Sequence, residues 1–192
     1  EPEVTEPEVT EPEVTEPATN VALNNGDQVV IYAPAYNKAL SATKTGNYNV
    51  GVDVVINDGV ISGYGETEIW TVTVNNDGSY SFANGGQNIA MGDQYTSMNL
   101  GLTYDDWNLI SLGDSLYNIQ NTGRETYMEW YAKYSNWSTY GANNAANDDQ
   151  FQLSIYIIGE GLLGEETTEP EVTEPEVTEP EVTEPEVTEP TV

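Results

Sequence analysis

The chain has 192 residues, with 33 Asp and Glu against 4 Lys and Arg, no His, no Cys and a formal net charge of −29. Without His or Cys it has no imidazole-activated nucleophile, no disulfide and no imidazole or thiolate metal site. The charge argues against nucleic acid and anionic membrane surfaces as partners, since both are bound chiefly through Lys and Arg.

Both ends of the chain are built from the pentamer EPEVT, over residues 1–17 and again over 165–192. Of the 10 Pro, only Pro34 lies between these tails. A Pro at every fifth position blocks helices and sheet ladders, and one Val per pentamer buries too little surface to form a core. We predict two disordered acidic Pro/Thr linkers flanking one module, 18–164.

The module is predicted to be all-β. Polar and apolar residues alternate over 71–74, 79–82 and 152–155, which is typical of half-buried strands. Turn-forming residues follow the first of these stretches at 75–78, and others lie at 112–115.

Two patterns recur three times along the module. In the first, an acidic residue precedes a large aromatic by two positions, in 68–72, 105–109 and 149–153, with the aromatics 37 and then 44 residues apart. In the second, a short apolar strand leads through a polar turn to another, starting at 30–32, 80–82 and 117–119. The last strand, around 155–158, is left to pair with the first, around 29–32. Three units of about four strands predict a β-trefoil, with a two-sheet β-sandwich as the alternative.

On these motifs the chain resembles the ricin-B-like β-trefoil family, whose repeats carry Gln-x-Trp with the Trp in the shared core. Trp70, Trp107 and Phe151 take the aromatic position. The Gln position is acidic in every unit, as Glu68, Asp105 and Asp149. The family's Gln supports its sugar site, so the resemblance implies the fold more strongly than the site.

The EPEVT spacers and the phrases TEIWTV and YMEWYA are similar in style to secreted multi-module proteins of gut Gram-positive anaerobes, including starch-adherence proteins. This resemblance implies an extracellular or cell-surface protein whose export signal and anchor lie outside this stretch. It also implies a module that is monomeric within a longer chain and binds polysaccharide or oligosaccharide, starch-type α-glucan above others. No apolar run is long enough to insert into a membrane.

The segment 129–140 is the sharpest candidate site, because five aromatics fall within eleven positions and a strand buries only alternate residues. We expect Trp130 or Tyr131 in the core and the later rings facing outward to stack on sugars. The candidate ligand-binding residues here are Trp130, Tyr131, Lys133, Tyr134, Asn136, Trp137 and Tyr140. Smaller candidates are Tyr36 and Lys38 in the first turn of unit one, Tyr95 in the matching region of unit two, and Tyr48 in an insertion of unit one.

The favoured function is a non-catalytic carbohydrate-binding module. The alternatives are a protein-binding or adhesion module using the same aromatic surface, and a purely structural spacer. Carboxylates for glycoside hydrolysis are present in number, but they lie in turns or follow the fold repeat, so we expect no enzyme. We also expect no cofactor and no metal. The pairs Asp105–Asp106 and Asp148–Asp149 are interpreted as solvated acidic turns, and calcium there is left open.

Overall fold

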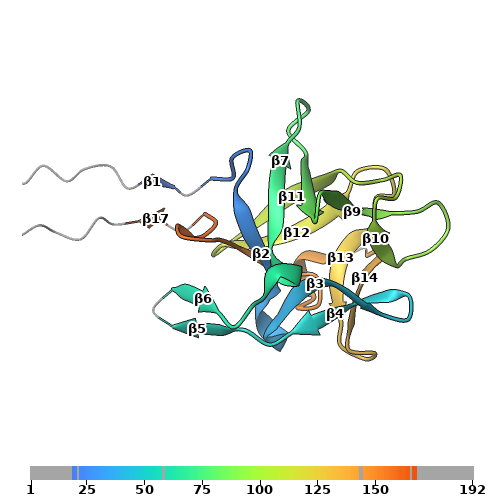
Figure 1. The fold of residues 1–192 in the computed structure, drawn as a ribbon, viewed down its shortest axis with the longest axis horizontal. Coiled ribbons are helices and arrows are strands. Elements are labelled where there is room, and N and C mark those ends of the chain that lie inside the picture. Colours follow the sequence, from blue (N-terminus) through green and yellow to red (C-terminus); the bar gives the residue numbers. More distant parts are fainter. Residues whose placement is uncertain (1–18, 21, 58, 143–144, 165, 168–192) are drawn as a thin grey trace, which may run out of the picture.

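A computed structural model describes residues 19–20, 22–57, 59–142, 145–164 and 166–167 (Figure 1). These residues form strands and three single-turn 3-10 helices: η1 (Pro34–Tyr36), η2 (Glu66–Glu68) and η3 (Ala145–Asn147). The all-β prediction is therefore confirmed. Within the described ranges, no helix has the length and apolar character needed to cross a membrane.

Six strands close into a barrel. They are β2 (Gln28–Ala33), β7 (Trp70–Val74), β8 (Tyr80–Asn84), β11 (Trp107–Gly113), β12 (Leu116–Asn121) and β15 (Ser154–Ile157). Antiparallel pairs run β2–β7–β8–β11–β12, and β15 pairs with β2. A bridge between Tyr117 and Leu153 joins β12 to the start of β15 and completes the ring.

Three hairpins cap the barrel, one in each unit. They are β3 (Lys38–Thr45) with β4 (Tyr48–Val52), β9 (Gln87–Met91) with β10 (Met98–Leu100), and β13 (Tyr127–Tyr131) with β14 (Asn136–Tyr140). Each follows the first barrel strand of its unit and pairs with it. A closed barrel with three such hairpins is a β-trefoil, as predicted, and the sandwich alternative is excluded.

The predicted pairing of the last strand with the first is confirmed. Ile155 lies opposite Ile31, and Tyr156 lies opposite Val30. Because successive side chains of a strand point to opposite faces, the two Ile enter the main core, and Val30 and Tyr156 enter a second apolar cluster.

That second cluster also contains Ile61, from an extra hairpin of unit one formed by β5 (Val55–Asn57) and β6 (Val60–Ser62). The remaining short strands are β16 (Gly161–Leu162), which pairs with β15, and β1 (Thr19–Asn20), which pairs with β17 (Glu166–Thr167). The short strands that precede and follow the barrel, β1 and β17, therefore lie side by side, at the left of Figure 1. The short strand β17 falls within the predicted linker 165–192. The predicted linker 1–17 and the remainder of 165–192 lie outside the described residues, so the boundaries 1–17, 18–164 and 165–192 stay predictions.

Two buried indoles repeat the same contact in units one and two. Trp70 and Trp107 have no exposed surface, and their Nε1 atoms donate to the carbonyls of Leu40 and Ile89, each at 3.0 Å. Each bond ties a barrel strand to the first strand of its unit's cap hairpin. A buried indole N–H needs such an acceptor, so the repeated aromatic is a core residue, as the resemblance implied.

In unit three the core position belongs to Leu153 and not to Phe151. Leu153 lies opposite Tyr117, as Trp107 lies opposite Tyr80 in unit two. Leu153 belongs to the main core cluster, whereas Phe151, which is also buried at 5% exposure, lies two residues earlier, outside that cluster and against a surface cavity. The assignment of Phe151 is therefore wrong, because the acidic-x-aromatic spacing falls in a turn before the strand begins.

Candidate functional site

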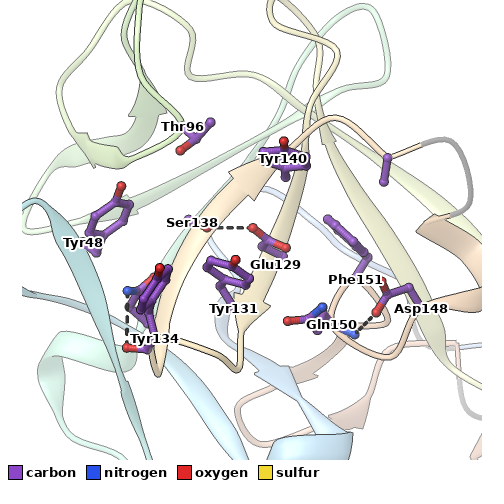
Figure 2. Close-up of a pocket in the computed structure, with 12 residues that line it drawn as sticks. Tyr48, Thr96, Glu129, Tyr131, Tyr134, Ser138, Tyr140, Asp148, Gln150 and Phe151 are labelled. Carbon is purple, nitrogen blue, oxygen red and sulfur yellow. Dashed lines mark hydrogen bonds between the residues drawn. The ribbon is translucent and has the colours of Figure 1, made fainter.

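A surface cavity of about 780 Å³ lies on the outer face of the β13–β14 hairpin in unit three (Figure 2). The hairpin itself contributes Glu129, Tyr131, Tyr134, Asn136, Ser138 and Tyr140. The segment after β14 contributes Ala142, Asp148, Gln150 and Phe151. Tyr48 of β4 and Thr96 of the β9–β10 loop complete the lining, so all three units take part.

The register of the hairpin explains which side chains reach this cavity. Glu129 lies opposite Ser138, and Tyr131 lies opposite Asn136. Residues directly opposite each other in an antiparallel pair share a face, and their neighbours in sequence point to the other face. The alternate pair, Trp130 opposite Trp137, consequently faces the core.

The prediction that Trp137 faces outward is therefore wrong. Trp137 has no exposed surface, and its Nε1 donates to the carbonyl of Ala39 at 3.2 Å. Trp130 is 4% exposed, which agrees with the expectation that it or Tyr131 enters the core. Neither indole is available to a ligand, because the four-residue turn at 132–135 pairs them on the inner face of the hairpin.

Four of the tyrosines named from the sequence, Tyr48, Tyr131, Tyr134 and Tyr140, line the cavity. Tyr134 and Tyr140 are 63% and 60% exposed, and Tyr48 from β4 is 37% exposed (Figure 2). The rings of Tyr131 and Tyr134 meet edge to face, with centroids 5.2 Å apart. Lys133 does not line the cavity, but its Nζ lies 5.4 Å from the centroid of the Tyr134 ring.

A carboxylate lies at the base of the cavity. Glu129 is only 4% exposed, and its Oε1 accepts a hydrogen bond from the Ser138 hydroxyl at 2.8 Å (Figure 2). Burial raises the pKa of this carboxyl above its ordinary value, and the negative charge of Asp148 raises it further, while the bond from Ser138 lowers it. The cavity therefore holds a desolvated acid beside a second carboxylate.

The wall formed by 148–151 is fixed to the hairpin by two hydrogen bonds, which main-chain N–H groups of the hairpin donate to Gln150. The Trp130 N–H donates to the Gln150 carbonyl at 2.9 Å, and the Ala132 N–H donates to Gln150 Oε1 at 3.1 Å. The Gln150 N–H in turn donates to Asp148 Oδ1 at 3.1 Å. These bonds place Asp148 at the cavity without help from a ligand.

Asn136 leaves one acceptor unused. Its Nδ2 donates to the Tyr134 carbonyl at 3.4 Å, whereas its Oδ1 is buried and has no hydrogen-bond partner among the described residues. Buried polar atoms are usually paired, and because this oxygen has almost no exposed surface, a donor from a ligand reaches it only if the side chains around it move.

Tyr36 and Lys38 do not line the cavity. Lys38 Nζ pairs with Asp53 Oδ1 at 2.5 Å and lies 6.0 Å from the Trp130 ring centroid. Burial raises the pKa of Tyr36, and the charges of Asp149 and Asp148 raise it further. Lys38 therefore lies beside the buried Trp130, and Tyr36 lies near the turn at 148–149, but neither residue lines the open site.

Several lining residues were missed by the sequence prediction, and only some had a local signal. Glu129 and Ser138 alternate with the buried indoles, so recognition of a hairpin centred on 132–135 would have placed them on the open face. Thr96 has no such signal, because it is brought to the site by bonds from the Thr139 N–H and hydroxyl to its carbonyl, at 2.8 and 3.0 Å.

No cluster of three or more His, Cys, Asp or Glu side chains suited to a metal ion occurs in the part of the chain that the structure describes. Asp106, one of the paired acids, accepts hydrogen bonds at Oδ1 from Asn75 and Ser81, at 2.8 and 3.0 Å. Asp105 Oδ2 accepts one from Asn88 at 2.8 Å. These two carboxylates hold together the turns around them.

No protein-family model matches the chain, and no curated protein matches it. Solved structures do. The chain is similar to ThreeFoil, a designed protein of threefold symmetry, at 16% identity over 67% of this chain and 96% of that one, with a TM-score of 0.53. It is also similar to the Macrolepiota procera ricin B-like lectin, solved with lactose, at 9% identity over 70% and 97% of the two chains and the same TM-score of 0.53.

A third similar structure is the endo-β-galactosidase of Clostridium perfringens that releases GlcNAcα1-4Gal. The match has 12% identity and a TM-score of 0.55, and it spans 69% of this chain but only 32% of the enzyme. At these identities the likeness establishes the fold alone. The chain is a β-trefoil whose structural neighbours include ricin-B-like lectins.

Proposed function

We propose that this protein is a non-catalytic carbohydrate-binding module and that its site is the cavity on the β13–β14 hairpin. The observation that carries the proposal is the combination of exposed tyrosine rings, Tyr134 and Tyr140, with a polar base formed by Glu129 and Asn136. A pyranose ring has an apolar face that stacks on an aromatic ring, while its hydroxyls donate to carboxylate and amide oxygens.

The packing of the hairpin supports a binding site on its outer face. The hairpin is anchored on its inner face by Trp130 and Trp137, so the outer face is held in position before a ligand arrives. An open cavity of this kind binds a single sugar weakly, and several modules joined by linkers raise the affinity by avidity. This fits an extracellular or cell-surface protein with further modules in a longer chain.

Starch-type α-glucan is the specific ligand that the sequence resemblance favours. The test is retention of the full 192-residue chain on insoluble starch, cellulose, xylan and mucin, beside Tyr134→Ala and Tyr140→Ala. Tyr95→Ala is the matched control, because Tyr95 is 73% exposed and does not line the cavity. We expect retention on a glycan that both site variants lose, that the control keeps and that free oligosaccharide of the same kind reverses.

The outcomes separate the alternatives. Retention that Tyr134→Ala and Tyr140→Ala leave unchanged would contradict the site. Absence of retention on every glycan would contradict the function and favour the protein-binding alternative. Incubation with the retained glycan should release no reducing ends; steady release abolished by Glu129→Gln would make the protein a glycosidase instead.

A further inference from the structure

The charge of the cavity is one-sided. Its lining includes the carboxylates of Glu129 and Asp148 and no Lys or Arg. Within the described part of the chain Glu129 forms no ion pair, and its carboxylate accepts a hydrogen bond from the Ser138 hydroxyl. A buried carboxylate that lacks a cation is costly, and a positively charged group from outside would offset that cost.

The walls of the same cavity are suited to a cation. The rings of Tyr48, Tyr131, Tyr134 and Tyr140 all line it. An ammonium group is attracted to the face of an aromatic ring within about 6 Å of its centroid. At the rim, the exposed Lys133 ammonium already lies 5.4 Å from the Tyr134 ring centroid, which leaves the rings of Tyr48, Tyr131 and Tyr140 for a ligand ammonium.

The hydrogen-bonding groups at the base favour a donor-rich ligand. The Ser138 hydroxyl already donates to Glu129, and the Asn136 Nδ2 already donates to the Tyr134 carbonyl. The remaining Asn136 Oδ1 is a buried acceptor without a partner among the described residues. An ammonium has three donors and no acceptor, so it complements this set better than a hydroxyl does.

We propose that the cavity selects a saccharide with a protonated primary amine, such as a free 2-amino sugar, over its neutral or N-acetylated counterpart. This inference rests on the proposed carbohydrate-binding function and names its ligand class. The ammonium lies between the Glu129 carboxylate and the tyrosine rings, and the sugar ring stacks on Tyr134 or Tyr140. N-acetylation removes both the charge and two of the donors, so it removes the preference.

The test is titration calorimetry of the full chain at 0.15 M salt with three tetrasaccharides: one of β-1,4-linked glucosamine, its fully N-acetylated form, and maltotetraose. We expect the amine form to bind about tenfold more tightly than either neutral form, the effect of one charge-assisted contact. Glu129→Gln and Asp148→Asn should each reduce that preference, because both keep the shape of the side chain and remove its charge.

The net charge of −29 attracts any oligocation, so a matched control is needed. Asp114→Asn removes one carboxylate from the exposed β11–β12 turn, outside the cavity, at a left-handed position with φ of 49° that Asn tolerates. This variant should keep the preference. Amine binding that is equally strong in Glu129→Gln, Asp148→Asn and Tyr134→Ala would be unspecific attraction and would overturn the inference.

Two further outcomes separate this inference from the proposed function. Equal binding of amine and neutral sugars, lost in Tyr134→Ala, would overturn the amine preference and leave carbohydrate binding standing. Binding of tetralysine as tight as that of the amine sugar, with the same dependence on Glu129, would contradict both and assign the cavity to a protein's ammonium groups.

Discussion

Trp130 and Trp137 lie directly opposite each other on the inner face of the β13–β14 hairpin, with ring centroids 5.9 Å apart and an angle of 66° between their planes. One position along, Glu129 lies opposite Ser138 on the outer face. The two indoles thus fix the hairpin against the core, and the same backbone carries the base of the cavity. A change on the inner face should affect folding, whereas a change on the outer face should affect binding.

Replacing the inner indole should destabilise the protein strongly. Trp137→Ala removes a fully buried ring and its hydrogen bond to the Ala39 carbonyl. Such a change costs about 3–5 kcal/mol in the free energy of unfolding, measured by urea denaturation. Trp137→Phe keeps most of the packing and should cost less. An unchanged urea midpoint in Trp137→Ala would contradict the burial of this ring.

Gly51 in β4 should not tolerate a side chain. A Cβ added there would overlap the six-membered ring of Trp130 and lie 3.1 Å from the Lys38 Cβ. Overpacking of this kind costs about 1–3 kcal/mol, so Gly51→Ala should lower the free energy of unfolding by that amount. Gly141→Ala is the control, since nothing lies within 4 Å of its added Cβ. Equal stability of the two variants would show that Trp130 moves aside freely.

The free energy of unfolding should depend on pH through the protonation of Glu129. Its pKa is raised in the folded state, chiefly by burial, so the protonated form favours folding. The corresponding stability is present below the unfolded pKa of glutamate, about 4.3, and is lost as the pH rises through the higher folded pKa. Glu129→Gln should therefore have a higher Tm than the unmodified chain at neutral pH.

This pH dependence is measured as the difference in Tm between the unmodified chain and Glu129→Gln from pH 4 to pH 8. Taking the difference removes the contribution that the other acidic residues make to the pH dependence of both proteins. The difference should grow in favour of the variant as the pH rises. A Glu129→Gln difference that does not change with pH would contradict the raised pKa.

The ion pair between Lys38 and Asp53 should contribute little to either folding or binding. The two side chains are 27% and 71% exposed, and exposed pairs are worth about 0–1 kcal/mol. The free energy of unfolding of Lys38→Ala should therefore lie within about 1 kcal/mol of that of the unmodified chain. The variant should also be retained on glycan as the unmodified chain is. Lost retention in a folded Lys38→Ala would extend the site into unit one.

Most of the fold could be predicted from local features of the sequence. Alternation of polar and apolar residues placed the barrel strands, turn residues separated them, and the threefold recurrence of a motif around Trp70 and Trp107 predicted the trefoil. These signals are local because strand faces alternate with a period of two and turns need particular residues. The recurrence failed at Phe151, where the motif falls in a turn and the core position passes to Leu153.

Only part of the site could be predicted from the sequence, because the rest depends on the register of the hairpin and on contacts between units. The sequence by itself determined that aromatics concentrate in 129–140 and that alternate ones must face out. Only the tertiary structure decided which ones, because a one-residue change of hairpin register reverses every side chain. It also brought Tyr48 and Thr96 from the other two units to the same cavity, which nothing in the local sequence specifies. Burial inside that assembly, and not residue type, raises the pKa of Glu129.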